Sequence, residues 1–214
     1  MLELMKLEIK KVKMGGYIKG AVIANLIMIT IGVMLLFVWK YEGNMQQIGL
    51  AKLFSMSGTM VKTVFVVMAS VLLARFIIEE YKNNTIALLF MYPINRKKLM
   101  IAKLLVVVSF TFICIVLSSI LLDVGICIMS NFFNFTPDKL SSSLILTTFM
   151  ITCGGALTFA CLGLIPLYFG MRKKSIPTTI VSSILIVSML NSGGGDGSSL
   201  KDVVALPIVL SIIG

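Results

Sequence analysis

Long apolar runs alternate with short polar intervals along this chain. The runs cover residues 20–39, 53–78, 100–130, 144–169 and 176–190. About 20 apolar residues in a helix cross the roughly 30 Å hydrocarbon layer of a bilayer. Lipid offers no hydrogen bonds to the backbone, so a spanning run must form a helix or a closed barrel. We therefore predict an all-α polytopic membrane bundle with about five or six transmembrane helices.

The two ends of the chain carry shorter apolar patterns. In residues 1–15, Leu2, Met5, Ile9 and Val12 recur at helical spacing between Lys and Glu residues. This pattern predicts an interfacial helix on the inner leaflet, with a frayed tail as the alternative. The last apolar segment, 203–214, is too short to span alone, so we expect a re-entrant segment or an incomplete sixth span. All 214 residues are predicted to form one transmembrane domain.

Some runs contain features that disturb a simple span. The run 100–130 would be longer than the bilayer is thick, so it must tilt, project or break. Pro166 should kink the inner end of the fourth run. Asn25 lies in the first run, where an interhelical hydrogen bond is favoured over a substrate contact. Asp123 lies in the outer half of the third run and is either a functional intramembrane carboxylate or a residue of the outer interface.

Composition supports a membrane protein and gives it an orientation. Hydrophobic residues make up 58% of the chain, against about 45–50% in soluble domains. The net charge of +10 comes from clusters at the ends of the apolar runs, which does not favour nucleic-acid binding. With the amino terminus inside, the inner segments hold Lys6, Lys10, Lys11, Lys13, Lys19, Arg75, Lys82, Arg96, Lys97, Lys98, Lys103, Arg172, Lys173 and Lys174. The outer segments hold Lys40, Lys52, Lys62, Lys139 and Lys201. This bias predicts a cytoplasmic amino terminus.

The residues needed for several kinds of chemistry are missing. The chain has no His, which excludes a Ser-His-Asp arrangement and disfavours a zinc site. Its four Cys residues form no CxxC pair and are expected to act as small hydrophobes. No GxxxxGK[ST] motif is present, so the chain does not bind ATP through a P-loop. We predict neither catalytic residues nor a metal nor a cofactor, and therefore no enzyme.

The polar interval between the second and third runs has the most informative pattern. Residues 85–92 form a short helix candidate that ends before Pro93. Ile86, Leu89 and Phe90 fall on one face of this helix. Such a face either docks into a groove of a soluble partner or lies on the membrane surface or the bundle.

The sequence EEYKNNTIALLFMYPINRKKLMIAK, residues 79–103, resembles the first cytoplasmic loop of ABC-2 type transporter permeases. The basic segment LEIKKVK, residues 7–13, is similar to the interfacial elbow helix of that family. The likeness is greatest to small permeases of bacterial peptide exporters, including bacitracin-resistance and lantibiotic-immunity systems. It implies that residues 85–92 are a coupling helix that docks on a separate ABC ATPase subunit. The docking residues would be Glu79, Glu80, Thr85, Ile86, Leu89, Phe90 and Tyr92.

The resemblance also implies a second permease chain, identical or different, and a place in the plasma membrane of a bacterium. Members of that family usually have six spans, with short re-entrant pieces before the sixth. The expected function is the membrane subunit of an ATP-driven exporter for an amphipathic peptide, an antibiotic or a lipid-like compound. Two alternatives remain: a membrane immunity or binding protein that transports nothing, and a secondary transporter that uses Asp123.

Overall fold

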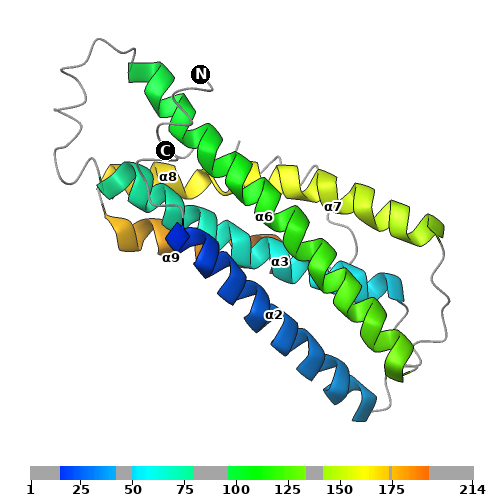
Figure 1. Ribbon diagram of the computed structural model, residues 1–214. Helices are drawn as coiled ribbons and strands as arrows, with labels where there is room; N and C mark the ends of the chain where they lie inside the picture. The colour runs from blue at the N-terminus through cyan, green and yellow to red at the C-terminus, as the bar shows by residue number, and fades with distance from the viewer. Residues whose placement is uncertain (1–14, 42–49, 80–95, 134–141, 174, 193–214) are drawn as a thin grey trace.

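The computed structural model describes residues 15–41, 50–79, 96–133, 142–173 and 175–192. Within these ranges the chain forms helices and no strands (Figure 1). Four apolar stretches are long enough to cross a membrane: Gly15–Val38, Lys52–Ile78, Lys98–Ser130 and Leu146–Lys173. The predicted all-α membrane bundle is confirmed. The interfacial helix was predicted for residues 1–15; Gly15 belongs to α2, and the rest of that segment lies outside the described residues, as does the segment 203–214.

The first helix, α2 (Gly15–Tyr41), lies at the edge of the bundle (Figure 1). It begins five residues before the predicted apolar run 20–39 and includes both Gly15 and Gly16. Many of its apolar side chains are exposed, among them Leu26 and Met34. In a membrane protein such a surface faces lipid or another chain.

The second helix, α3 (Leu50–Leu73), continues as a π-helix, η2 (Ala74–Ile78). The N–H of Glu79 bonds to the carbonyl of Ala74, five residues earlier, which is the hydrogen-bond pattern of a π-turn. Most of the largest fully buried side chains among the described residues belong to α3 and η2: Val61, Phe65, Val66, Leu72, Leu73, Ile77 and Ile78. These two elements therefore form the centre of the bundle, against which α6, α7 and α9 pack.

The longest helix, α6 (Arg96–Phe133), has 38 residues and no break. At 1.5 Å per residue it is about 57 Å long, well beyond the hydrocarbon thickness of about 30 Å. Its first turns project past the neighbouring ends of α3 and α8 (Figure 1). Of the three outcomes expected for this run, a break does not occur, and tilt or projection from the bilayer remains a prediction.

The fourth predicted span, 144–169, is not one helix. It is divided into α7 (Ser142–Leu162) and α8 (Ile165–Lys173), separated by a turn at Gly163 and Leu164. Pro166 lies in the first turn of α8 and has no N–H to donate, so the break falls just before it. The last described helix, α9 (Ile176–Ser192), has 17 residues, about 26 Å, and is short for a crossing.

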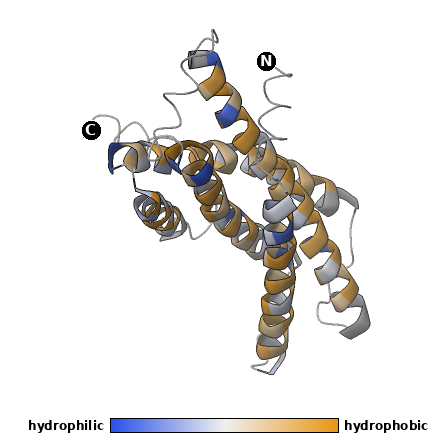
Figure 2. Ribbon diagram, turned by 60° about the vertical axis from the view of Figure 1, so that its left-hand side comes forward, coloured by the Kyte–Doolittle hydropathy of each residue, from blue (hydrophilic) through white to orange (hydrophobic). Residues whose placement is uncertain are grey.

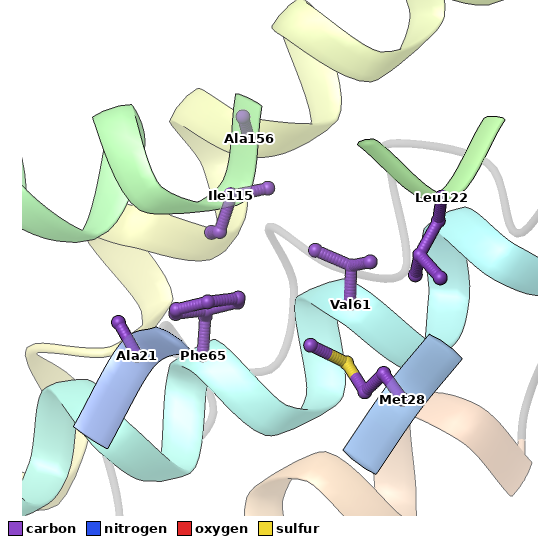
Figure 3. Packing of buried hydrophobic residues seen from close by; sticks show 7 residues of the cluster. All are labelled: Ala21, Met28, Val61, Phe65, Ile115, Leu122 and Ala156. Carbon is purple, nitrogen blue, oxygen red and sulfur yellow. The ribbon is translucent and has the colours of Figure 1, made fainter. Parts of the chain in front are cut away.

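Close packing between the helices uses small and apolar side chains. Phe65 of α3 is fully buried and lies in one cluster with Ala21 of α2, Ile115 of α6 and Ala156 of α7 (Figure 3). Apolar residues cover most of every helix (Figure 2). Since lipid is as apolar as these side chains, dispersion contacts and interhelical hydrogen bonds hold the bundle together.

A hydrogen bond between two serines links the centre of the bundle to α9. The Oγ atoms of Ser70 in α3 and Ser183 in α9 lie 2.9 Å apart, and both residues are fully buried. Such bonds between transmembrane helices are worth about 0.6 kcal/mol on average. The bond therefore fixes the rotation of α9 against α3 more than it adds stability.

Candidate functional site

One end of the bundle collects the termini of five elements. Here α2, α6 and α9 begin, and η2 and α8 end (Figure 1). The rings of Tyr17 and Phe76 lie 6.4 Å apart, centroid to centroid, and join α2 to η2. We call this the basic end because it carries Lys19, Arg75, Lys98, Lys103, Arg172 and Lys173. By contrast, Lys52 lies at the opposite end and Lys62 lies within α3.

Gly170 lets α8 come very close to η2 and α9 at the basic end. A Cβ atom added at Gly170 would lie 2.5 Å from Cγ2 and 2.9 Å from Oγ1 of Thr179, and closer still to Cδ1 of Ile78. Both neighbouring side chains are fully buried. No residue larger than glycine fits at position 170 without displacing them.

Glu79 is the one predicted docking residue that the described ranges include. It follows η2 directly and is half-buried. Glu80, Thr85, Ile86, Leu89, Phe90 and Tyr92 lie outside the described residues. The structure thus places the two elements that flank this segment, η2 and α6, and both belong to the basic end.

Lys103 is a feature of the basic end whose burial the sequence did not predict. Its side chain, only 2% exposed, donates from Nζ to the backbone carbonyl of Phe76 at 3.3 Å. An ammonium group is costly to bury without hydrogen bonds, so this carbonyl is part of what stabilises it. The contact ties the start of α6 to η2. The apolar neighbours of Lys103 in the sequence were a hint of burial, but they do not identify its partner.

Asp123 lies within the apolar stretch Lys98–Ser130 of α6 and pairs with α3. Its Oδ1 accepts a hydrogen bond of 2.9 Å from Oγ of Ser57. The same hydroxyl also lies 2.9 Å from the carbonyl of Phe54. Because a serine has one proton to donate, the two acceptors share it.

Asp123 also lines a groove of about 400 Å³ between α3, α6 and α7. Ser57, the hydrogen-bond partner of Asp123, lines a second, apolar cavity of about 290 Å³ between α2, α3 and α6. The two partners thus line different cavities, Asp123 the groove and Ser57 the apolar cavity. The prediction that Asp123 is an intramembrane polar site remains a prediction.

Asn25 does not form the interhelical hydrogen bond that its position suggested. Its Nδ2 donates to the carbonyl of Ala21 in its own helix at 3.1 Å. Its Oδ1 is buried and has no hydrogen-bond partner among the described residues. Asn25 does not line the groove of Asp123 either. The structure therefore does not bring the two predicted polar residues into one site.

Lys62 is a charged residue within the apolar stretch Lys52–Ile78 and lies beside α7. Its Nζ lies 5.7 Å from the ring centroid of Phe159, within the range of a cation–π contact. A Cβ atom at Gly155 would fall 2.8 Å from this Nζ. The absence of a side chain at Gly155 thus makes room for the ammonium group.

Long apolar helices around a few buried polar groups, with positive charge gathered at one end, define a polytopic membrane protein. Comparison with known proteins specifies the class further. A family model described as "ABC-2 family transporter protein" matches residues 4–189, and the chain belongs to this family. It is thus a permease-type membrane component of a transporter, which is not catalytic by itself.

A relative covers the whole chain. The "Uncharacterized protein YcbO" of Bacillus subtilis (strain 168) is 39% identical over 213 residues, which is 100% of this chain and 93% of that protein. Its description assigns no substrate. No solved structure matches the chain.

Proposed function

We propose that the chain is the membrane subunit of an ABC exporter that moves an amphipathic peptide, antibiotic or lipid-like compound out of a bacterial cell. The observation that carries the proposal is membership of the ABC-2 transporter family over residues 4–189. Because the sequence has no P-loop motif, a separate ATPase subunit supplies the energy. A second permease chain completes the path through the membrane.

The basic end supports this proposal because it suits a cytoplasmic docking region. Positive residues favour the cytoplasmic side of a membrane. The proposed coupling helix, residues 85–92, would leave the bundle between η2 and α6. These elements are joined by the bond from Lys103 to Phe76, so a push on the segment reaches both helices.

Co-purification tests the docking. The tagged chain is purified from its own host, and the amount of P-loop ATPase that it retains is measured together with transport. Leu89→Asp, on the proposed apolar face, should abolish both ATPase retention and transport. Leu88→Asp is the matched control, because position 88 falls on the opposite side of a helix from Ile86, Leu89 and Phe90. It should leave both nearly unchanged.

Three outcomes would contradict the proposal. In the first, no ATPase is retained by the unmodified chain. In the second, Leu89→Asp transports as well as the unmodified chain does. In the third, the chain protects cells without ATP hydrolysis by any partner, which would favour an immunity or binding protein instead.

A further inference from the structure

The groove beside Asp123 combines one carboxylate with apolar walls. Phe54 of α3, Ile120 and Val124 of α6, and Phe149 of α7 line it together with Asp123. Ile120, Val124 and Phe149 are 42%, 52% and 50% exposed on the bundle surface. The groove therefore opens on the apolar outer surface of the bundle, where a ligand can reach it from the bilayer.

The carboxylate of Asp123 is incompletely paired by the protein. Ser57 gives it a share of one proton. The ammonium of Lys62 forms no ion pair with it in the described part of the chain and lies against Phe159. An ionised carboxylate in lipid is costly unless it is paired, so a positive group is its natural complement.

The other polar groups of the groove favour the same charge. Ser119 is buried and uses its proton on its own helix, donating to the carbonyl of Ile115 at 2.9 Å. Its oxygen keeps lone pairs that accept from an ammonium or guanidinium group. Thr152 also lines the groove. Apart from the thiol of Cys127, the polar residues that line the groove with Asp123 thus carry hydroxyl groups, on Ser119, Thr148 and Thr152.

We propose that this groove binds a cationic amphiphile, with its ammonium or guanidinium group against Asp123 and its apolar part against Ile120, Val124 and Phe149. A volume of about 400 Å³ lies at the lower end of the range for small-molecule sites. It fits a charged head with part of a tail, or one basic side chain of a peptide. The proposal names the substrate class of the exporter proposed above and rests on that function.

A binding experiment on the chain alone tests the proposal. The full chain is placed in phosphatidylcholine nanodiscs without any ATPase. Binding of tritiated dodecylammonium is measured and compared with binding of tritiated dodecanol, which has the same tail without the charge. Asp123→Asn should weaken binding of dodecylammonium by about tenfold or more, the value of a hydrogen bond to a charged group. Binding of dodecanol should be unchanged.

Two variants serve as controls. Asp123→Glu keeps the charge and should retain the preference for dodecylammonium. Thr30→Val alters an exposed threonine of α2 that bonds to its own helix at Leu26 and does not line the groove, and it should bind both probes as the unmodified chain does.

Several results would overturn the proposal. In the first, the unmodified chain binds dodecylammonium no better than dodecanol. In the others, Asp123→Asn weakens binding of both probes equally, or weakens binding of neither. A photoreactive dodecylammonium that labels α2 rather than α6 and α7 would also overturn it. The first and last results need no variant, so they hold even if Asp123→Asn fails to fold. Failure of the proposed exporter function appears separately, as loss of ATPase retention in the co-purification assay.

Discussion

Replacing Gly170 by alanine should loosen the basic end of the bundle. The new Cβ would lie 2.5 Å from Cγ2 of Thr179, whereas carbon atoms pack at about 3.5–4.0 Å. The neighbouring side chains of Thr179 and Ile78 are fully buried and have little room to move. Such overpacking costs about 1–3 kcal/mol. The helix-forming advantage of alanine over glycine offsets about 0.5–1 kcal/mol, so we expect a net loss centred on about 1 kcal/mol.

The assay is the free energy of unfolding in mixed micelles, followed by circular dichroism during titration with sodium dodecyl sulfate. The matched control is Gly154→Ala on α7, where no atom lies within 4 Å of the new Cβ. This variant should gain about 0.5–1 kcal/mol, the opposite sign.

A mutant cycle isolates the clash from other effects. Thr179→Ala removes both atoms of the threonine that approach position 170, and Ile78→Val removes Cδ1 of the isoleucine. In the background carrying both changes, Gly170→Ala should cost little or nothing, since its close contacts are gone. The packing argument is refuted if Gly170→Ala is as stable as the unmodified chain, or if its cost is the same in both backgrounds.

Two further variants probe the buried charges. Lys103→Met should lower the free energy of unfolding by about 1–3 kcal/mol because the carbonyl of Phe76 loses a donor. Lys98→Met, on an exposed side chain of the same helix, should change the free energy of unfolding by less than about 0.5 kcal/mol, and equal losses in the two variants would contradict this account. Gly155→Ala should push the ammonium of Lys62 away from α7 and raise its labelling by an amine reagent, measured by mass spectrometry. Unchanged labelling would mean that the space at Gly155 does not determine where the ammonium group of Lys62 lies.

The sequence predicted the helices well because lipid leaves a spanning backbone few alternatives. It predicted their ends less well, since helical hydrogen bonding is local and continues past the last apolar residue. Thus α2 already includes Gly15. The proline rule indicated a disturbance near Pro166, but the full break into α7 and α8 also involves Gly163. A Cβ atom at Gly163 would lie 3.1 Å from Cβ of Ala69 on α3, a contact that no local pattern contains.

Sequence pattern found the charged residues of the candidate site but not their partners. Asp123 was identified because a carboxylate within an apolar run is costly. Its hydrogen bond to Ser57 joins residues 66 positions apart and depends on how α3 and α6 rotate against each other. The burial of Lys103 depends on the same packing. Asn25 was assigned an interhelical bond, yet a carbonyl one turn earlier in its own helix lies within reach of its Nδ2.

The π-turn of η2 gives the proposed docking mechanism a physical basis. η2 touches α2 through Tyr17 and Phe76, α6 through Lys103, and α8 through Gly170. A π-turn interrupts the regular ladder of a helix and often occurs at functional positions. In the proposed function, an ATPase that displaces residues 80–95 acts first on the end of η2. Because η2 is packed against these three helices and against α9, with no free space at Gly170, the helices must move together or the contacts must break. Loss of transport in Gly170→Ala with ATPase binding retained would locate the coupling at this junction, whereas loss of both would place it in the docking itself.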